Sequence, residues 1–443
     1  MKFHCTFRFI IIIFFFNLTQ CRRQTDTIEE IVSIVFWHSF VASSLPALNN
    51  LIEDFHAEYP NIRIKAQYVP TGDALIQKLI TAIQSGTTPD ISWVHSDFLD
   101  KLVTADAIYP MDHFIKDPDG LSAEIMEDIY SHLLCSGSYK GTLYTLPMEA
   151  TTLALLYNKD LFREAGLDPD MPPRTWDELV DFSVRLTVDK DGDGYFDQYG
   201  FYVPVFPASG ALSIWMVLQW SPFVWQAGGT LVNEEQTKVL FNSESGIQAL
   251  TLWKTLYQRL QLNRFSLAHD LGFASQSLAM VMDGPWNLPR YRRMKQMDWG
   301  VAPLPAGPVC QATYLAGEHL AVFKQSAHPR EAWTFIKWIL RPDIQARFSM
   351  ESGYLPVRRS VLNLSDYQDY LNNHPHHRAF IEQMEIGRGR ETIDYYRIEI
   401  NQLIAEAVEK TIVGDMDPNF MLDVAARKAN ILLQSLDRQK MAR

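Results

Sequence analysis

The segment formed by residues 153–179 constrains the fold of this chain more than any other stretch. It opens with five consecutive apolar residues, 153–157, a run with the length and density of a buried β-strand. A short helix follows, and Gly166 stands where such a helix ends. Prolines keep the next residues extended until Thr175, an N-cap residue with Glu178 three positions later. The segment therefore predicts a strand, a helix, a rigid linker and a second helix.

The first elements after residue 30 alternate between strand and helix. β-Branched, aromatic and alternating residues predict the strands, and apolar residues at helical spacing predict the helices. The five ranges are 31–37, 45–59, 61–70, 73–85 and 89–94. This order predicts an α/β fold with a parallel, doubly wound sheet, in which ligands bind beyond the C-terminal ends of the strands.

Residues 1–21 are typical of an export signal. Basic residues precede an apolar run, residues 9–16, that is too short to span a bilayer. Cys21 ends a Leu-Thr-Gln-Cys sequence that resembles the bacterial lipobox, in which the cysteine is lipidated, although Gln20 is larger than the residue usual there. An ordinary secretory signal and an uncut anchor are the alternatives. All three export the protein, with residues 22–30 as a polar tether.

The composition of the chain argues against some classes of binding partner. The chain has 443 residues, enough for two or three domains, and a formal net charge of −12. Nucleic acid is not expected as a partner, because binding phosphates requires a basic surface. No stretch after the signal is long and apolar enough to predict a transmembrane helix.

Several short motifs resemble one family in order and spacing. They are Phe36-Trp37-His38-Ser39, Pro89-Asp90-Ile91, the run from Leu156 to Phe162, Met282-Asp283-Gly284-Pro285-Trp286 and Gly353-Tyr354-Leu355-Pro356-Val357. Together they resemble the extracellular solute-binding proteins of bacterial ABC importers, which include the maltose- and glycerol-3-phosphate-binding proteins. The resemblance covers nearly the whole mature chain.

This resemblance implies a two-lobed periplasmic-binding-protein fold of type II, with a ligand cleft at the hinge. Each lobe would be a doubly wound sheet with flanking helices. Lobe 1 is expected to comprise residues 31–148 and 283–325, and lobe 2 residues 149–282 and 326–443.

The implied function is to capture a carbohydrate or polyol by hinge closure and deliver it to an ABC permease. The protein is expected to be a monomer, exported to the periplasm or outer face of the cell membrane and held there by a lipid anchor. A glycerol-3-phosphate or glycerophosphodiester ligand is the first alternative.

Aromatic and polar residues at predicted strand ends and lobe crossings are the candidate ligand contacts. A sugar needs flat aromatic faces against its C–H groups and fixed polar groups for its hydroxyls. The candidates are Trp37, His38, Asp97, Glu149, Trp225, Trp286, Glu318, His319, Tyr354 and Arg397. The resemblance places family ligand contacts in the loops of Glu149, His319 and Tyr354, and the glycerol-phosphate branch has an arginine near the position of Arg397. Each could instead be an ordinary core, hinge or surface residue.

An aspartate-rich segment follows the second predicted helix of the opening stretch. Its spacing of oxygen donors matches part of a calcium loop of the EF-hand type, although position 12 is Gly200 and no bidentate Glu follows. The expected ligands of a structural calcium are Asp189, Asp191, Asp193, Tyr195 and Asp197. A solvated turn is the alternative.

The sequence contains no catalytic motif of a serine hydrolase, zinc protease or nucleotide-binding enzyme, and no cofactor is expected to be required. Glycoside hydrolysis needs two carboxylates flanking the scissile bond. Glu149 and Glu318 could meet across the cleft in this way. A glycoside hydrolase is therefore the second alternative to a binding protein.

Overall fold

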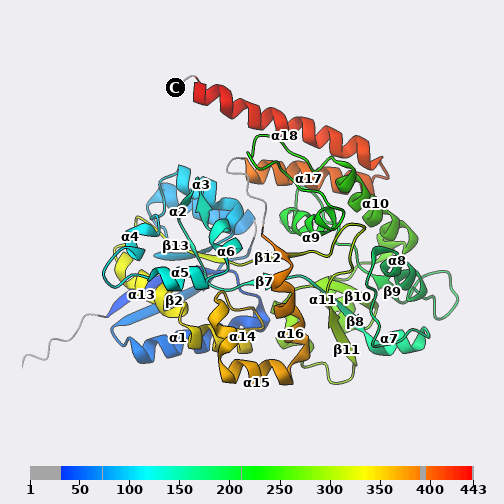
Figure 1. Cartoon of the computed structure of the whole chain (residues 1–443), viewed down its shortest axis with the longest axis horizontal. Coiled ribbons are helices and arrows are strands. Elements are labelled where there is room, and N and C mark those ends of the chain that lie inside the picture. Colours follow the sequence, from blue (N-terminus) through cyan, green and yellow to red (C-terminus); the bar gives the residue numbers. More distant parts are fainter. Residues whose placement is uncertain (1–30, 72, 211, 390–395, 442–443) are drawn as a thin grey trace, which may run out of the picture.

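The structure, a computed structural model, describes residues 31–71, 73–210, 212–389 and 396–441. Figure 1 shows two groups of strands and helices, with a narrower region between them where β7 (Thr151–Thr152) and β12 (Thr313–Ala316) lie. The predicted signal, tether and Cys21 lie outside the described residues. Within them, no helix has the length and apolar character needed to cross a membrane.

The sheet of lobe 1 has five strands in the order β2-β1-β3-β13-β6. Their bounds are β1 (Val32–His38), β2 (Ile62–Tyr68), β3 (Ile91–Val94), β6 (Leu146–Pro147) and β13 (His319–Val322). β1 pairs in parallel with both β2 and β3, as the sequence predicts. β13 runs antiparallel to β3 and β6, so this sheet is mixed.

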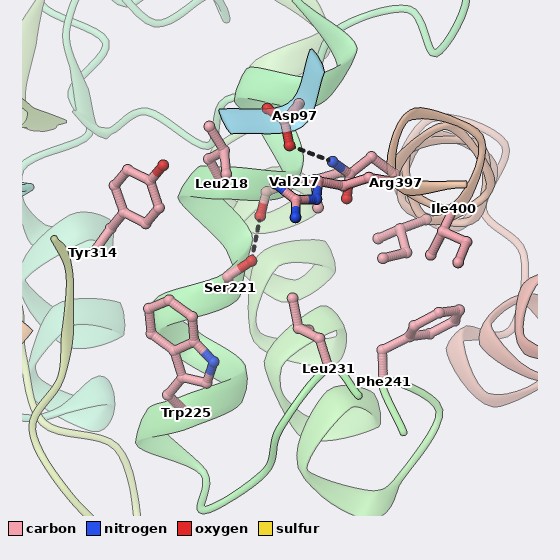
Figure 2. Close-up of a pocket in the computed structure, with 12 residues that line it drawn as sticks. Asp97, Val217, Leu218, Ser221, Trp225, Leu231, Phe241, Tyr314, Arg397 and Ile400 are labelled. Atoms are coloured by element: carbon pink, nitrogen blue, oxygen red, sulfur yellow. Dashed lines mark hydrogen bonds between the residues drawn. The ribbon is translucent and has the colours of Figure 1, made fainter. Parts of the chain in front are cut away.

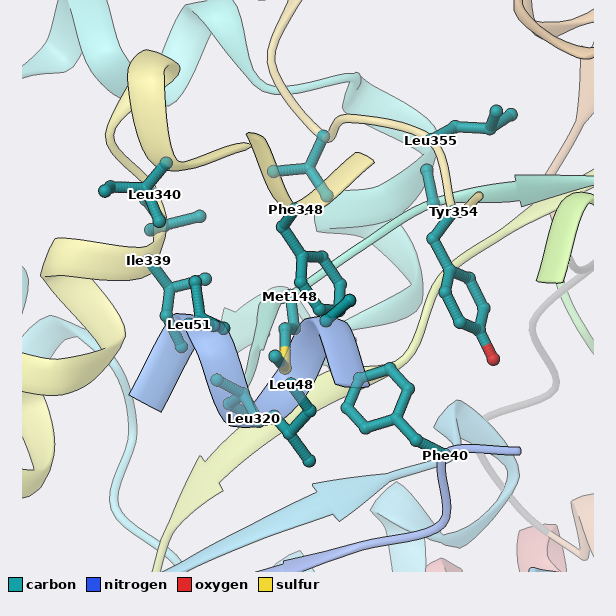
Figure 3. Close-up of a cluster of buried hydrophobic side chains, with 14 of the residues drawn as sticks. Phe40, Leu48, Leu51, Met148, Leu320, Ile339, Leu340, Phe348, Tyr354 and Leu355 are labelled. Carbon is teal, nitrogen blue, oxygen red and sulfur yellow. The ribbon is translucent and has the colours of Figure 1, made fainter. Parts of the chain in front are cut away.

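Helices from distant parts of the chain cover this sheet. They are α1 (Leu45–Glu58), α2 (Asp73–Ser85), α3 (Leu99–Thr104), α4 (Asp112–Ile115), α5 (Ala123–Asp128), α6 (Ser131–Ser136), α13 (Pro329–Ile339), α14 (Pro342–Ser352) and α15 (Ser365–Asn373). A hairpin of β4 (Ser138–Tyr139) and β5 (Thr142–Leu143) also belongs to this part of the chain. Figure 3 shows Leu48 and Leu51 of α1 packed with Phe348 of α14, and Tyr354 at the edge of this core beside Phe40.

The sheet of lobe 2 has four strands in the order β11-β8-β10-β9. They are β8 (Ala154–Asn158), β9 (Tyr199–Phe201), β10 (Leu278–Asp283) and β11 (Trp299–Ala302). β8 is buried along its whole length and pairs antiparallel with β10 on one side and β11 on the other. The predicted buried strand is therefore the one around which this sheet forms.

The helices of lobe 2 are α7 (Lys159–Glu164), α8 (Trp176–Arg185), α9 (Ser213–Gln226), α10 (Glu244–Arg259), α11 (His269–Ala274), α17 (Arg397–Ile412) and α18 (Pro418–Met441). The side chain of Thr175 accepts a hydrogen bond from the backbone N–H of Glu178 and caps α8 as predicted. Gly166 follows Ala165, the C-cap residue of α7, and has a φ of 68°, a left-handed conformation that glycine adopts without strain.

The chain passes between the lobes along β7 and β12, which pair antiparallel and belong to a third sheet with β14 (Gly387–Arg388). β7 joins β6 to β8, and β12 leads directly into β13. A Cβ added to Gly317, the residue after β12, would lie 2.0 Å from the carbonyl oxygen of Glu149. Only glycine fits at this position because the two crossing segments approach so closely.

The expected lobe boundaries are wrong in two places. Residues 299–302 form β11, which pairs with β8 and so belongs to lobe 2. Helices α13 and α14 pack on β13 and α1 and so belong to lobe 1. The sequence could not reveal either placement, because amphipathic helices and short apolar strands pack equally well on either sheet. Two further short helices are α12 (Leu288–Tyr291), which lies near α14, and α16 (Pro375–Glu382), which lies near β11.

Candidate ligand-binding site

A cavity of about 250 Å³ lies between the two lobes. Its walls come from the end of β3, the N-terminal half of α9, the segment after β10, and the crossing segments before β7 and after β12. This volume lies just below the range of about 300–1,000 Å³ found for small-molecule pockets. The cavity is therefore of a size for a small solute and meets both lobes.

Aromatic rings form one side of this cavity. The rings of Trp215 and Trp286 meet edge to face with their centroids 5.4 Å apart. Trp286 also faces Tyr354, with centroids 6.4 Å apart and planes inclined by 39°. Trp93 adds a fourth ring to the lining. Trp286 and Tyr354 were among the predicted ligand contacts, whereas Trp215 and Trp93 were not.

Two carboxylates, Glu149 and Glu318, also line the cavity. One oxygen of Glu149 accepts a hydrogen bond of 3.0 Å from the backbone N–H of Glu318. The other Glu149 oxygen is buried and has no hydrogen-bond partner in the described part of the chain. The two side chains thus lie side by side on one wall. They do not face each other across the cleft, as the hydrolase hypothesis requires.

His95 extends this polar wall and was not among the predicted contacts. Its Nδ1 lies 3.0 Å from a carboxylate oxygen of Glu318, and its Nε2 lies 2.7 Å from the hydroxyl of Thr71. His95 and Thr71 both follow strands of the lobe 1 sheet, at the edge where parallel strands present their C-terminal ends. Their place after β2 and β3 was the available signal in the sequence, but nothing there distinguished them from other loop residues.

The environment of Glu149 disfavours its charge. Its side chain is 1% exposed. Burial raises the pKa of Glu149 well above the ordinary value, and the neighbouring charge of Glu318 raises it further. Burial likewise raises the pKa of Tyr354, so its phenol stays neutral and can both donate and accept hydrogen bonds.

His269 lies at the border of the cavity and contacts a buried acid, Asp283. Asp283 accepts hydrogen bonds from the Tyr291 hydroxyl at 2.6 Å and the Asn287 amide at 2.8 Å. Burial alone would lower the pKa of His269, but the interaction with Asp283 outweighs it and raises the pKa. Neither residue of this pair was among the predicted contacts.

Three predicted contacts lie in the core of lobe 1 and do not line the cavity. The indole N–H of Trp37 donates to Gln67 at 3.0 Å, and burial lowers the pKa of His38 to about 4. Both nitrogens of His319 lie near hydroxyls, at 2.9 Å from Ser136 and 3.1 Å from Thr145. The prediction that these side chains contact the ligand is wrong for this cavity. Trp37 and His38 are neighbours on β1 and point to opposite faces of the lobe 1 sheet, and both are buried there.

Three other predicted contacts, Asp97, Trp225 and Arg397, line a second, smaller pocket of about 30 Å³. Figure 2 shows Asp97 and Arg397 toward one end of this pocket and Trp225 at the other. Arg397 donates a hydrogen bond to the carbonyl oxygen of Ser96, and the Asp97 carboxylate accepts one of 3.2 Å from Asn401. Only Asp97 also lines the larger cavity. Arg397 and Trp225 therefore do not line that cavity: Arg397 on α17 reaches Ser96 of lobe 1, and Trp225 on α9 packs in the core of lobe 2.

The aspartate-rich loop lies on the surface of lobe 2. One carboxylate oxygen from each of Asp189, Asp191 and Asp197 lies within 4.8 Å of the others. Asp193 is not part of this group; its carboxylate accepts a hydrogen bond from the backbone N–H of Tyr195 instead. Three oxygen donors in one place fit the preference of calcium for carboxylates.

The comparisons with known proteins establish the family. The profile of the bacterial extracellular solute-binding proteins matches residues 50–375, and the chain belongs to that family. As the sequence resemblance implied, the chain is the solute-binding component of an ABC importer. The family is an extracellular or periplasmic one, and its members are binding proteins.

Individual relatives are similar over almost their whole length. A Brucella abortus protein named as a binding protein is 26% identical over 402 residues, which cover 89% of this chain and 92% of that one. The sn-glycerol-3-phosphate-binding periplasmic protein UgpB of Escherichia coli is 23% identical, with 93% and 94% covered.

Two solved structures share the fold with TM-scores of 0.76 and 0.78, each at 25% identity and 91% coverage of this chain. They are the cyclic α-maltosyl-1,6-maltose binding protein of Arthrobacter globiformis, 99% covered, and an ABC transporter solute-binding protein of Thermotoga lettingae with bound α-D-tagatose, 100% covered. The type II two-lobed fold is therefore confirmed.

The buried charge of Glu149 predicts a stabilising substitution. Because its folded-state pKa is raised, ionisation of Glu149 makes unfolding easier as the pH rises above its ordinary value of 4.5. Glu149→Gln keeps an acceptor for the N–H of Glu318 and removes the charge. We expect this variant to be more stable than the wild type by about 1–3 kcal/mol at pH 7.5 and about equally stable at pH 4. Urea unfolding at both pH values measures this.

The matched control is Glu124→Gln, the same change on the exposed surface of α5. It should alter stability by less than about 0.5 kcal/mol at either pH. Equal stability of Glu149→Gln and wild type at pH 7.5 would show that the carboxyl carries no electrostatic cost in the folded protein.

Proposed function

We propose that this protein captures a carbohydrate or polyol in the cavity between its lobes and delivers it to an ABC permease. The proposal rests on one observation: packed aromatic rings and hydrogen-bonding carboxylates line the same cavity, whose walls come from both lobes. Aromatic rings pack against the C–H face of a sugar, and fixed acceptors bind its hydroxyls. The sugar ligands in the names of the two solved relatives agree with this chemistry.

Transport requires that the ligand favour one arrangement of the lobes. A solute that touches Glu149 and Glu318 at the crossing and Trp215 on α9 gains contacts from both lobes only when they are closed. It therefore shifts the population toward the closed form by its additional contacts there. The paired strands β7 and β12 are short segments on this path, and small rotations about them would close the cleft.

A glycerol-phosphate ligand is the alternative that the resemblance to UgpB supports. An arginine fork suits a phosphate, but Arg397 lines the smaller pocket and donates to Ser96. Among the described residues that line the larger cavity there is no lysine or arginine. The larger cavity thus favours a ligand without a phosphate.

We propose further that the protein acts as a monomer and catalyses no reaction of its ligand. Hydrolysis of a glycosidic bond needs carboxylates on both sides of that bond. Glu149 and Glu318 share one wall and are linked through a backbone hydrogen bond. Recovery of an unchanged oligosaccharide after prolonged incubation, and the elution volume of the purified protein, test these two statements.

Deleting an aromatic ring of the cavity tests the carbohydrate proposal. We expect one or more sugars from a panel of mono- and oligosaccharides to bind the wild type, as measured by calorimetry. Trp286→Ala should then weaken binding by about 10- to 30-fold, since a buried aromatic contact contributes about 2 kcal/mol. X-ray scattering should show a more compact protein with the bound sugar.

Phe420→Ala on the exposed surface of α18 is the control and should leave the affinity unchanged. Absence of binding by any sugar or polyol to the folded protein would refute the proposal. An equal loss of affinity in both variants would remove Trp286 from the site.

The lipid anchor is a separate proposal and rests on Cys21 and the apolar run before it. We expect the wild-type protein to remain with membranes after an alkaline carbonate wash and to incorporate labelled palmitate. Cys21→Ser should abolish the labelling, because the thiol is the site of acylation. Unlabelled wild-type protein would contradict lipidation, and mass spectrometry of its N-terminus would then distinguish a cut signal from an uncut anchor.

We also propose that the aspartate-rich loop binds a structural calcium ion. The support is the grouping of Asp189, Asp191 and Asp197 together with their oxygen chemistry. Calcium at 100 times its Kd should raise the free energy of unfolding by about 2.7 kcal/mol, and excess EGTA should remove this gain. Asp191→Asn should weaken the effect, whereas Asp177→Asn on exposed α8 should not. Identical melting temperatures with calcium and EGTA would refute the site.

A further inference from the structure

The lining of the large cavity is acidic. Asp97, Glu149 and Glu318 contribute carboxylates, while the cavity's described residues include no lysine or arginine. The two histidines present, His95 and His269, already contact Glu318 and Asp283 respectively. A solute entering this cavity therefore meets a negative potential in a partly desolvated space, where electrostatic interactions are stronger than in water.

Glu149 has no cationic neighbour at contact distance among the described residues, whereas Glu318 contacts His95. Asp97 accepts a hydrogen bond from the neutral Asn401 amide, and one oxygen of Glu318 is also buried without a described partner. Glu149 accepts only the backbone N–H of Glu318 on one oxygen, while its second oxygen is buried without a partner. A buried carboxylate oxygen in this condition is costly unless a ligand supplies a donor.

From this we infer that the cavity selects a ligand with a protonated amine, such as an amino sugar, over neutral or phosphorylated sugars. The inference rests on the proposed carbohydrate function and specifies the chemistry of its ligand. An ammonium group donates charge-assisted hydrogen bonds to Glu149 and Glu318, and such bonds are about twice as strong as neutral ones.

The aromatic wall fits the same ligand. The rings of Trp286, Trp215 and Tyr354 present π faces and edges to the cavity. A cation near an aromatic face is attracted by the ring, most strongly when water is excluded. A phosphate, in contrast, would be placed beside two carboxylates without a lysine or arginine in the described lining.

A charge series on one sugar scaffold tests this selectivity in the wild-type protein. The probes are glucosamine, galactosamine and mannosamine, their parent hexoses, the N-acetylated forms and the 6-phosphates, with the chitosan disaccharide and cellobiose as a longer pair. Calorimetry at pH 7 gives each affinity. We expect at least one amine to bind about tenfold or more tightly than its parent hexose and its N-acetyl form, and no phosphate to bind more tightly than its hexose.

The outcomes distinguish this inference from the proposed function. A parent hexose or a phosphate that binds as tightly as its amine overturns the inference, while carbohydrate binding stands. If no probe binds, whether neutral or charged, the result counts against both the inference and the proposed carbohydrate function.

The substitution Glu149→Gln tests whether this carboxylate causes the preference for the amine. We expect it to reduce the preference for the amine over the hexose by at least about tenfold, because the charge that attracts the ammonium group is removed. Glu124→Gln, with the same chemical change on exposed α5, should keep the wild-type preference. An undiminished preference in Glu149→Gln would overturn the role of this carboxylate. The wild-type charge series stays decisive even if the variant folds poorly.

Discussion

The hydrogen bond from the backbone N–H of Glu318 to the carboxylate of Glu149 is the contact on which the site depends. It joins the two segments that cross between the lobes, directly beside the paired strands β7 and β12. Gly317 permits this approach because no Cβ intervenes. The same contact places two acids side by side in a low-dielectric position, so the hinge and the polar chemistry of the cavity share one set of residues.

A second set of contacts joins the lobes on the side of α17. Arg397 donates to the carbonyl of Ser96, and Lys101 on α3 lies 2.8 Å from Glu399. Both reach from one lobe to the other, since α17 packs on α9 and α10 while α3 belongs to lobe 1 (Figure 1). The Lys101–Glu399 pair is partly exposed and contributes modestly to stability, on the order of 0–1 kcal/mol. Arg397 is buried, so its contribution depends on its hydrogen bonds. These residues therefore connect the lobes instead of contacting a solute in the large cavity.

Short-range residue patterns predicted those secondary-structure elements that depend on neighbouring residues. The strand at β8, the cap of α8 at Thr175 and the parallel pairing of β1 with β2 and β3 all follow from short-range residue preferences. Helix α9 escaped prediction because nearly all its residues are buried, so it shows no amphipathic period, and it contains Pro222. Trp215, on this helix, was missed for that reason. His95 and Thr71 were missed because their interaction joins two loops that lie 24 residues apart in the chain.

The sequence by itself determined the family, the two α/β lobes and several residues of the cavity, namely Asp97, Glu149, Trp286, Glu318 and Tyr354. Only the tertiary structure decided which lobe each late segment joins and that Trp37, His38 and His319 are core residues. It also decided that Glu149 and Glu318 share a wall. The reason is physical: a motif specifies the local backbone and residue type. The direction in which a side chain points, and the charges it meets, depend on packing against residues far away in the chain.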